Sequence, residues 1–531
     1  MDPMMQTDVL EPESQSGTAE AEAGLAVEPP AEDLIASEPA EDLVASEPVE
    51  DLIASEPVED PMAAEPAEPL AEASVAAAGS QDVAPALAAA PELRSREDRF
   101  LAEGIIRALK LGLVPQRGIE RIVVGREREA QQLRRDLDYT VSGGSGIKFL
   151  SGDYGSGKTF MCSLVREEAW KRNMVVSVVE LGRNAPLYRL DAVYRQIMAG
   201  LRTRELPYAP AFDYLIQQWL FGLEQEVQTE HNLDPLVDAD RDRIGELVAQ
   251  RINAHLAKVS VFDSSFANAF RGYYAAQLRG DSMTSDAALG WLRGEQNIPQ
   301  ELKGKFHIKG GVNKDTAFAF LRAMIALLVS IGYAGLVVIL DETELIRSVN
   351  RADARRAAYE NLKLLADAAG QGALGHCYVL VTGTPELFSD PQKGIPSYPA
   401  LADRLRSRHP AVEGRALTEV RGAILQLDGF SAERLVEVAQ KVRDIHGFAF
   451  DWEPRHRLDL RVLKDLGGRL SAKLGQEART FPRGFLKTMV DILDICEQDP
   501  TYDPRADFDP DREAVAAIAS VEKTEAHLLD F

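Results

Sequence analysis

The stretch SGDYGSGKTF at residues 151–160 decides the fold, because Gly152 to Thr159 match the pattern G-x-x-x-x-G-K-[ST] at every position. The backbone N–H groups of such a loop point inward at phosphates, and the helix that follows adds its positive end. In this pattern Lys158 reaches the β- and γ-phosphates of a nucleotide, and the hydroxyl of Thr159 holds Mg²⁺. The sequence therefore predicts an ATP-binding loop formed by Gly152, Asp153, Tyr154, Gly155, Ser156, Gly157, Lys158, Thr159 and Phe160.

The segments around this loop predict an α/β fold with a parallel sheet. IKFL at 147–150 is a short apolar strand, 158–173 has a helical pattern, and VVSVVEL at 175–181 is a second strand. Strand, helix and strand in this order are typical of parallel βαβ units. The alternation returns later, with helices at 315–331 and 351–369 and strands at 335–340 and 377–383.

Composition and periodicity divide the chain into four parts. The expected boundaries are 1–93 for a disordered acidic Pro/Ala/Glu repeat segment, 94–422 for a P-loop ATPase core, 423–497 for a helical lid and 498–531 for an acidic C-terminal tail. Inside the core, the segment at about 202–312 interrupts the α/β alternation. We interpret it as a helical insertion, because its pattern is mostly helical and no alternating strand pattern appears.

The N-terminal segment carries nearly all of the net charge. Residues 1–93 hold 23 Asp or Glu and no Lys or Arg, which accounts for −23 of the formal −25 and leaves −2 for the rest. The segment contains the repeats EPAEDLVAS (38–46), EPVEDLIAS (47–55) and EPVEDPMAA (56–64). These units bury too little apolar surface to offset chain entropy, and each contains proline, which favours a solvated disordered tail. The alternative is an acidic arm that docks on a basic partner or competes with nucleic acid for a basic surface.

A second motif, LVVILDETE at 336–344, supplies acidic residues at the end of a buried strand. Asp341 ends the apolar run, where its carboxylate can orient the magnesium shell. Glu342 follows it, where a general base can polarise the attacking water. An acidic cap at a strand end explains such a pair when it stands alone, but the upstream loop favours the catalytic interpretation. Glu344 is the weaker candidate and is expected to face solvent or a partner.

Hydroxyl groups end the third apolar strand. In CYVLVTGTPEL at 377–387, Thr382 or Thr384 is positioned to hydrogen-bond the γ-phosphate or the attacking water. The turn before Pro385 explains Thr384 almost as well.

Arginines provide two further candidates. ADRLRSRHP at 402–410 contains Arg404, Arg406 and Arg408, one of which can reach the γ-phosphate of a neighbouring subunit. Arg483, at a helix start in TFPRGFL, can swing the lid onto the nucleotide. The competing interpretations are arginines on a solvated helix for the first group and a surface ion pair for Arg483.

One long apolar run has the length of a membrane span. AMIALLVSIGYAGLVVIL at 323–340 has 18 residues without a charge. GYAG interrupts it and Asp341 follows it, so we expect a buried helix, a turn and a buried strand, and no membrane partner. The three cysteines, Cys162, Cys377 and Cys496, lie far apart, which fits a reducing cytoplasm.

Together these motifs resemble an AAA+ ATPase of the branch that contains origin-recognition and helicase-loader proteins. GREREAQQL at 125–133 resembles the entry segment of that fold, and the resemblance implies that the preceding Ile122, Val123 and Val124 line the adenine pocket. A closer resemblance is to the BREX ATP-binding family, the BrxC- and BrxD-like proteins of bacterial phage-defence islands. It rests on DYGSGKTF (153–160), RGYYAAQLRGD (271–281) with WLRGE (291–295), GYAGLVVILDETELI (332–346) and VTGTPELF (381–388).

This resemblance implies a homo-oligomeric ATPase that serves a defence system beside a helicase or DNA-modifying enzyme. BrxD-like members are short, as the body of this chain is, whereas BrxC-like members are much longer. The acidic repeats are not part of the family pattern. The nearly neutral body argues against strong unspecific DNA binding, although a local patch around 404–409 or on the insertion stays open. The leading hypothesis is an ATPase that loads or remodels a DNA-processing partner. The runner-up is a nucleotide-gated switch. An ATP-stabilised scaffold is least favoured because the hydrolytic residues are intact, and the paired carboxylates, the lid and the absence of an evident acceptor site count against a small-molecule kinase.

Overall fold

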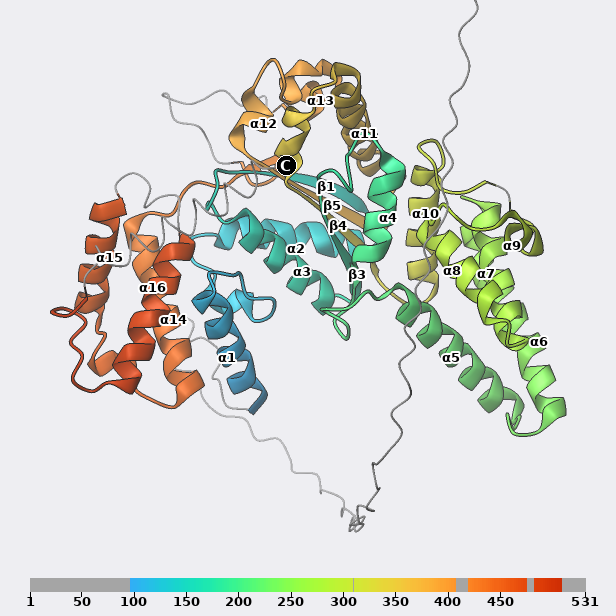
Figure 1. Ribbon diagram of the computed structural model, residues 1–531, viewed down its shortest axis with the longest axis horizontal. Helices are drawn as coiled ribbons and strands as arrows, with labels where there is room; N and C mark the ends of the chain where they lie inside the picture. The colour runs from blue at the N-terminus through green and yellow to red at the C-terminus, as the bar shows by residue number, and fades with distance from the viewer. Residues whose placement is uncertain (1–95, 309, 407–418, 475–481, 509–531) are drawn as a thin grey trace, which may run out of the picture. The chain divides into compact units, whose positions relative to one another are not determined.

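The computed structural model describes residues 96–308, 310–406, 419–474 and 482–508 (Figure 1). The chain divides into two units, Met1–Ala84 and Pro85–Phe531, and all described residues belong to the second. The expected acidic repeats, Arg408 and most of the C-terminal tail therefore lie outside the described residues.

A six-stranded sheet forms the centre of the second unit, in the order β3-β2-β4-β5-β1-β6. Its strands are β1 (Ser145–Ser151), β2 (Met174–Glu180), β3 (Leu201–Arg202), β4 (Gly335–Asp341), β5 (Cys377–Gly383) and β6 (Ile424–Gln426). All neighbouring strands are parallel except β2 and β3. The predicted parallel α/β fold is confirmed, and the four predicted strands correspond to β1, β2, β4 and β5.

Two short strands were not expected. The sequence pattern predicted helix from 423 onward, but β6 adds three residues beside β1, and β3 adds two beside β2. Strands of this length contain too few residues for an alternating pattern to appear.

The register brings the carboxyl ends of the central strands to one edge of the sheet. Ser151 of β1 lies beside Gly383 of β5, and Glu180 of β2 lies beside Asp341 of β4. Ligands of open parallel sheets bind at this edge, so the loop after β1 and the acidic residues after β4 face the same space.

Helices cover both faces of the sheet (Figure 1). Met174 and Val176 of β2 share a buried cluster with α2 and α3, whereas Val175 and Val179 pack with α4, α10 and α11. Alternate residues of one strand thus reach opposite cores, which explains why these strands are almost continuously apolar. The covering helices are α2 (Glu127–Val141), α3 (Lys158–Lys171), α4 (Leu190–Gly200), α10 (Ala317–Ser330) and α11 (Ala352–Gly370).

The apolar run at 323–340 forms the end of α10, a turn and most of β4, as predicted. Of the helices in the described ranges, none has the length and apolar character that crossing a membrane requires.

The insertion is helical, with α5 (Phe212–His231), α6 (Asp238–Val259), α7 (Ser264–Leu278), α8 (Ser282–Arg293) and α9 (Gln300–Lys305). Aromatic side chains attach it to the sheet layer through α10. The Phe320 ring of α10 meets the rings of Phe266 and Trp291 at centroid distances of 5.8 and 5.0 Å. The Tyr194 hydroxyl of α4 donates a hydrogen bond to Leu292 O.

The segment predicted as the lid contains α14 (Ala432–Phe450), α15 (Leu460–Leu474) and α16 (Pro482–Gln498). Helix α1 (Arg96–Lys110) packs against α14 and α16, although it precedes the sheet in sequence (Figure 1). The remaining short elements are η1 (Ile119–Ile122), η2 (Thr343–Ser348), α12 (Pro385–Ser389), η3 (Ile395–Ser397), α13 (Pro399–Leu405) and η4 (Pro454–His456).

Candidate nucleotide-binding site

The loop between β1 and α3 has a conformation that requires glycine. Gly155 and Gly157 have φ angles of 77° and 99°, in the left-handed region where a side chain is strained. A Cβ atom on Gly152 would lie 2.3 Å from Ser156 Oγ, which leaves no room for a side chain. Helix α3 begins at Lys158, directly after the loop, as the motif requires.

The Lys158 ammonium lies inside the curl of this loop. Its Nζ donates hydrogen bonds to Gly152 O at 2.7 Å and Asp153 O at 3.3 Å. It also lies 5.1 Å from the centroid of the Tyr154 ring. A positive charge held in this place can bind the phosphates of an incoming nucleotide.

The structure brings Asp341 and Thr382 together from neighbouring strands. The Thr382 hydroxyl donates to Asp341 Oδ1, and the Glu342 N–H donates to the same oxygen at 3.1 Å. Both hydrogen bonds are accepted by Oδ1. They fix the orientation of the carboxylate and leave Oδ2 available for another ligand. Carboxylate and hydroxyl oxygens are the ligands that Mg²⁺ prefers, and Asp341 Oδ2 with Thr159 Oγ1 therefore fits the ion that the motif implies.

Glu342 has a strained backbone and a shifted acidity. Its φ of 56° lies in the left-handed region, which is uncommon for a residue with a side chain. Burial raises the pKa of its carboxyl to about 7, with further contributions from Glu344 and Asp341. A carboxyl that exchanges a proton near neutral pH suits a general base.

The expectation for Glu344 is wrong, because its side chain faces neither solvent nor a partner. It is 7 % exposed, and neither carboxylate oxygen has a hydrogen-bond partner among the described residues. Burial raises its pKa. The cause lies in the backbone: after the left-handed Glu342 the chain enters the tight η2 turn, which directs Glu344 inward.

Thr384 is buried and occupies the N-cap position of α12, before Pro385. Its hydroxyl makes no capping bond there. Because Thr382 contacts Asp341 and Thr384 lies beyond the strand end, the two hydroxyls occupy different places, and their catalytic roles stay predictions.

The lid reaches the loop through Arg483, at the start of α16. Its Nη2 donates a hydrogen bond to Thr159 Oγ1 at 3.2 Å. The structure thus brings Arg483 to the predicted Mg²⁺ ligand, in agreement with a lid that approaches the nucleotide. Its action on nucleotide stays a prediction.

Sequence reasoning missed Arg126, which is buried beside the loop. Its guanidinium donates to Ser156 O at 3.2 Å and to Asp428 O, and it lies 5.4 Å from the Phe430 ring centroid. It therefore ties the loop to the segment that leads into the lid. The only available signal was its place in the entry segment, where several charged residues surround it.

The apolar approach to that entry segment is also buried. Val124 lies in the core that the sheet shares with the lid, and Val123 O accepts a hydrogen bond from Lys441 Nζ of α14 at 2.6 Å. These contacts place Val124 between core and lid. That Ile122, Val123 and Val124 line an adenine pocket stays a prediction.

The two described arginines of the 402–410 segment differ in their partners. Arg404 forms an ion pair with Asp367 of α11 and donates to Ala400 O. Arg406 lies 3.9 Å from Asp403, and its side chain is 70 % exposed. Arg404 is thus held within the chain, whereas the Arg406 side chain is mostly exposed.

The comparison with known protein families agrees with the ATP-binding loop. A sequence profile described as "BREX system ATP-binding protein BrxC/D" matches residues 99–512. Among solved structures, the Orc1 protein of Aeropyrum pernix in complex with DNA is similar, with a TM-score of 0.34, 11 % identity, and coverage of 78 % of this chain and 69 % of that one. A comparison with curated proteins gives no match.

Proposed function

Because the chain belongs to the BREX system ATP-binding protein BrxC/D family, we propose that it hydrolyses ATP to ADP and phosphate in an anti-phage defence system. The observation that carries the proposal is the position of Glu342. This glutamate follows Asp341, whose carboxylate accepts a hydrogen bond from Thr382. It therefore lies at the edge of the sheet where the loop after β1 begins. Burial raises the pKa of its carboxyl, which suits a group that accepts a proton from water.

Each residue of the site has a proposed role. Glu342 accepts a proton from the attacking water, and Lys158 neutralises charge on the β- and γ-phosphates. Thr382 or Thr384 orients the water or the γ-phosphate. Thr159 and Asp341 would hold Mg²⁺, which stabilises the phosphate charge when it is bound. Arg483 closes the lid on the nucleotide, and Arg406 or Arg404 acts from a neighbouring subunit.

The work done with ATP is proposed from the family alone. We infer that a homo-oligomer loads, remodels or regulates a DNA-processing partner, such as a helicase or a DNA-modifying enzyme, in the cytoplasm. The four parts of the chain proposed from sequence suit this role, with a core, an insertion for contacts and a lid. Whether DNA acts on this chain is a separate question, and it is tested by comparing ATP hydrolysis with and without DNA.

One observation favours a second function, a nucleotide-gated switch. Arg483 connects the lid to Thr159 by one exposed hydrogen bond, so a nucleotide with Mg²⁺ bound at Thr159 would compete with this bond. A switch needs this coupling and slow hydrolysis, whereas a remodelling enzyme needs the coupling and fast hydrolysis. A scaffold would need neither.

Steady-state ATP hydrolysis by the full chain, with and without DNA, tests the proposal. We expect Glu342→Gln to bind a fluorescent ATP analogue normally and to lose activity by about 10²–10⁴-fold, the range for a general base. Glu246→Gln, at an exposed position of the insertion, is the matched control. Hydrolysis raised by DNA supports the DNA-linked motor, and slow hydrolysis indifferent to DNA supports the switch. Full activity of Glu342→Gln would reject Glu342 as the base.

A further inference from the structure

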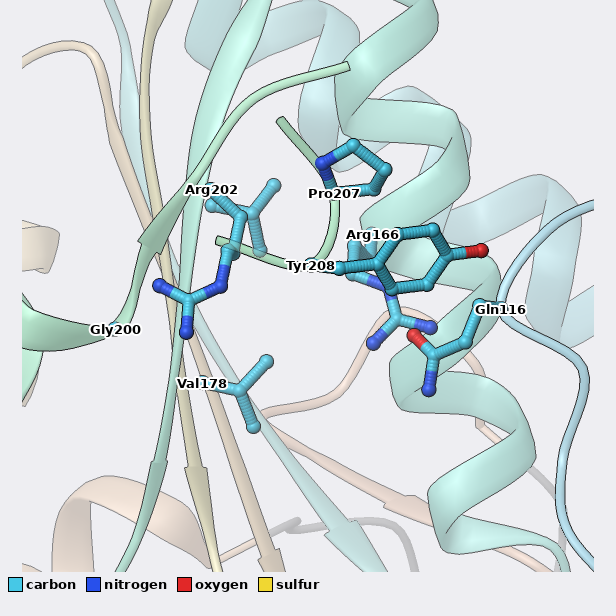
Figure 2. Close-up of a pocket in the computed structure, with 8 residues that line it drawn as sticks. Gln116, Arg166, Val178, Gly200, Arg202, Pro207 and Tyr208 are labelled. Atoms are coloured by element: carbon cyan, nitrogen blue, oxygen red, sulfur yellow. The ribbon is translucent and has the colours of Figure 1, made fainter. Parts of the chain in front are cut away.

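A pocket lies at the outer edge of the sheet, beside α3 and apart from the ATP-binding loop. It has a volume of about 240 Å³ and is lined by Gln116, Arg166, Val176, Val178, Gly200, Arg202, Pro207 and Tyr208 (Figure 2). None of these residues belongs to Gly152–Phe160. The pocket is smaller than the ~300–1,000 Å³ typical of sites that bury a drug-sized ligand. It therefore suits one charged group and a part of the molecule attached to it.

The two arginines of this pocket contact neutral groups, and the Arg166 guanidinium also lies 5.5 Å from the centroid of the Trp170 ring. Arg166 donates to Ser163 Oγ at 3.2 Å, and its buried Nε has no hydrogen-bond partner. Arg202 donates to two backbone carbonyls, Ala199 O at 3.0 Å and Leu201 O at 2.8 Å. Within the part of the chain that the structure describes, neither guanidinium has an ion pair.

Both guanidinium groups lose hydration through burial, and neither has an ion-pair partner among the described residues. Burial lowers the pKa of Arg166 and of Arg202, which reflects this cost. An anionic ligand would remove the cost, because guanidinium groups bind phosphate and carboxylate oxygens with strong, charge-assisted hydrogen bonds.

The placement of the charges favours phosphate over carboxylate. Figure 2 shows Arg202 and Val178 on one side of the pocket and Arg166, Tyr208 and Gln116 on the other. A planar carboxylate directs its two oxygens to one side, whereas a tetrahedral phosphate offers oxygens in several directions. The apolar lining by Val178, Pro207 and the Tyr208 ring suits the sugar or ring that carries the phosphate.

We propose that this pocket, between Arg166 of α3 and Arg202 of β3, binds a phosphate ester in addition to the ATP bound by the loop. A mononucleotide and a phosphate of a nucleic-acid strand share this chemistry. The site lies on the helix whose first residues are Lys158 and Thr159, so a ligand on Arg166 touches the same rigid element as the nucleotide.

Calorimetric titration of the full chain tests the site while saturating Mg·ADP fills the loop. The probes are uridine monophosphate, uridine without phosphate, and single-stranded oligothymidylate. We expect the monophosphate to bind, uridine not to bind, and Arg202→Gln to weaken binding by about tenfold or more, as loss of a charge-assisted bond does. Binding of oligothymidylate alone, with the same dependence on Arg202, supports the site and assigns its phosphate to a strand.

Two variants guard against trivial outcomes. Tyr208 is 72 % exposed, so Tyr208→Ala is expected to leave the fold intact while it removes one wall of the pocket. This variant is expected to bind uridine monophosphate more weakly than the wild type does. Arg241→Gln, at an exposed position of the insertion and not among the lining residues, is the control and is expected to bind normally. Equal affinity in the wild type, Arg202→Gln and Tyr208→Ala, or no binding of either phosphate probe, overturns the proposal.

Discussion

The guanidinium of Arg483 donates a hydrogen bond to the hydroxyl of Thr159, although the two residues are 324 positions apart in the sequence. Thr159 follows Lys158, and its hydroxyl is the predicted ligand of Mg²⁺. A guanidinium and a divalent cation repel each other at one oxygen, so nucleotide binding is expected to release Arg483 from Thr159. The freed arginine then lies close to the phosphates, where it can bind one of them.

The first prediction concerns this arginine. Arg483→Ala is expected to weaken ATP binding by about tenfold, because one charge-assisted hydrogen bond to phosphate is lost. Arg461→Ala, an exposed lid position on α15, is the control and should bind ATP as the wild type does. Equilibrium titration with a fluorescent ATP analogue measures both. Equal affinities of the two variants would show that Arg483 is only a surface residue of the lid.

The second prediction concerns the shape of the ATP-binding loop. Gly152→Ala places a methyl group 2.3 Å from Ser156 Oγ and 3.2 Å from Leu427 Cβ, so the loop must shift. Overpacking of this kind costs about 1–3 kcal/mol, and we expect ATP affinity to fall accordingly. Gly182→Ala, where an added Cβ meets nothing within 4 Å, is the control. Unchanged ATP affinity in Gly152→Ala would mean that the loop adapts freely.

The third prediction concerns action between subunits. Arg406→Ala is expected to retain ATP binding and to lower hydrolysis on the order of 10³-fold, as loss of a trans-acting arginine does. Arg404→Ala should lower hydrolysis less, because Asp367 already holds that guanidinium. The control is Arg356→Ala, an exposed position on α11.

Mixing two inactive variants tests whether the arginine acts in trans. Subunits with Arg406→Ala keep Glu342, and subunits with Glu342→Gln keep Arg406. Mixed oligomers therefore contain sites in which both groups are native, and part of the activity should return. Absence of recovery in oligomers shown to contain both variants would contradict action across an interface.

The features that could be predicted from the sequence are set either by residues adjacent in the chain or by the alignment of parallel strands. The phosphate-binding loop is a continuous motif, and Asp341 and Thr382 meet because parallel strands end at one edge. Glu344 could not be placed, because a single left-handed residue, Glu342, redirects the chain after β4. Periodicity carries no information about such a bend.

Contacts between distant helices could not be predicted either. The Arg483 hydrogen bond, the burial of Arg126 and the packing of α1 on the lid all depend on how the lid sits against the sheet. A charged residue in an exposed-looking helical pattern gives no signal of which distant carbonyl or hydroxyl it meets. The same holds for the Arg166–Arg202 pocket, which forms from four separate segments.

The last prediction concerns a buried histidine that joins α14 to α16. His446 of α14 hydrogen-bonds Asp494 Oδ1 through Nε2 at 3.0 Å, and Trp452 Nε1 donates to its Nδ1 at 2.9 Å. Lys110 of α1 donates to the other oxygen of Asp494. The ring therefore carries its proton on Nε2 and is neutral, and burial lowers its pKa, against the raising effects of Asp494 and Glu497.

The sign of the pH dependence follows from this lowered pKa. As the pH falls, the unfolded chain takes up a proton at an ordinary pKa of about 6.5, before the folded chain does. The contribution of His446 to the free energy of unfolding is thus complete above pH ~6.5 and is lost as the pH falls below it. We expect His446→Gln to reduce this free energy by about 1–3 kcal/mol at pH 7.5 and to flatten its decline toward pH 5.5.

Chemical denaturation at the two pH values measures this decline, and His456→Gln, an exposed position in η4, is the control that keeps the wild-type slope. Because other groups titrate in the same range, the informative quantity is the difference between the slopes of the two variants. Equal slopes would mean that the folded and unfolded chains protonate His446 alike. That result would contradict the lowered pKa that follows from the burial of this ring.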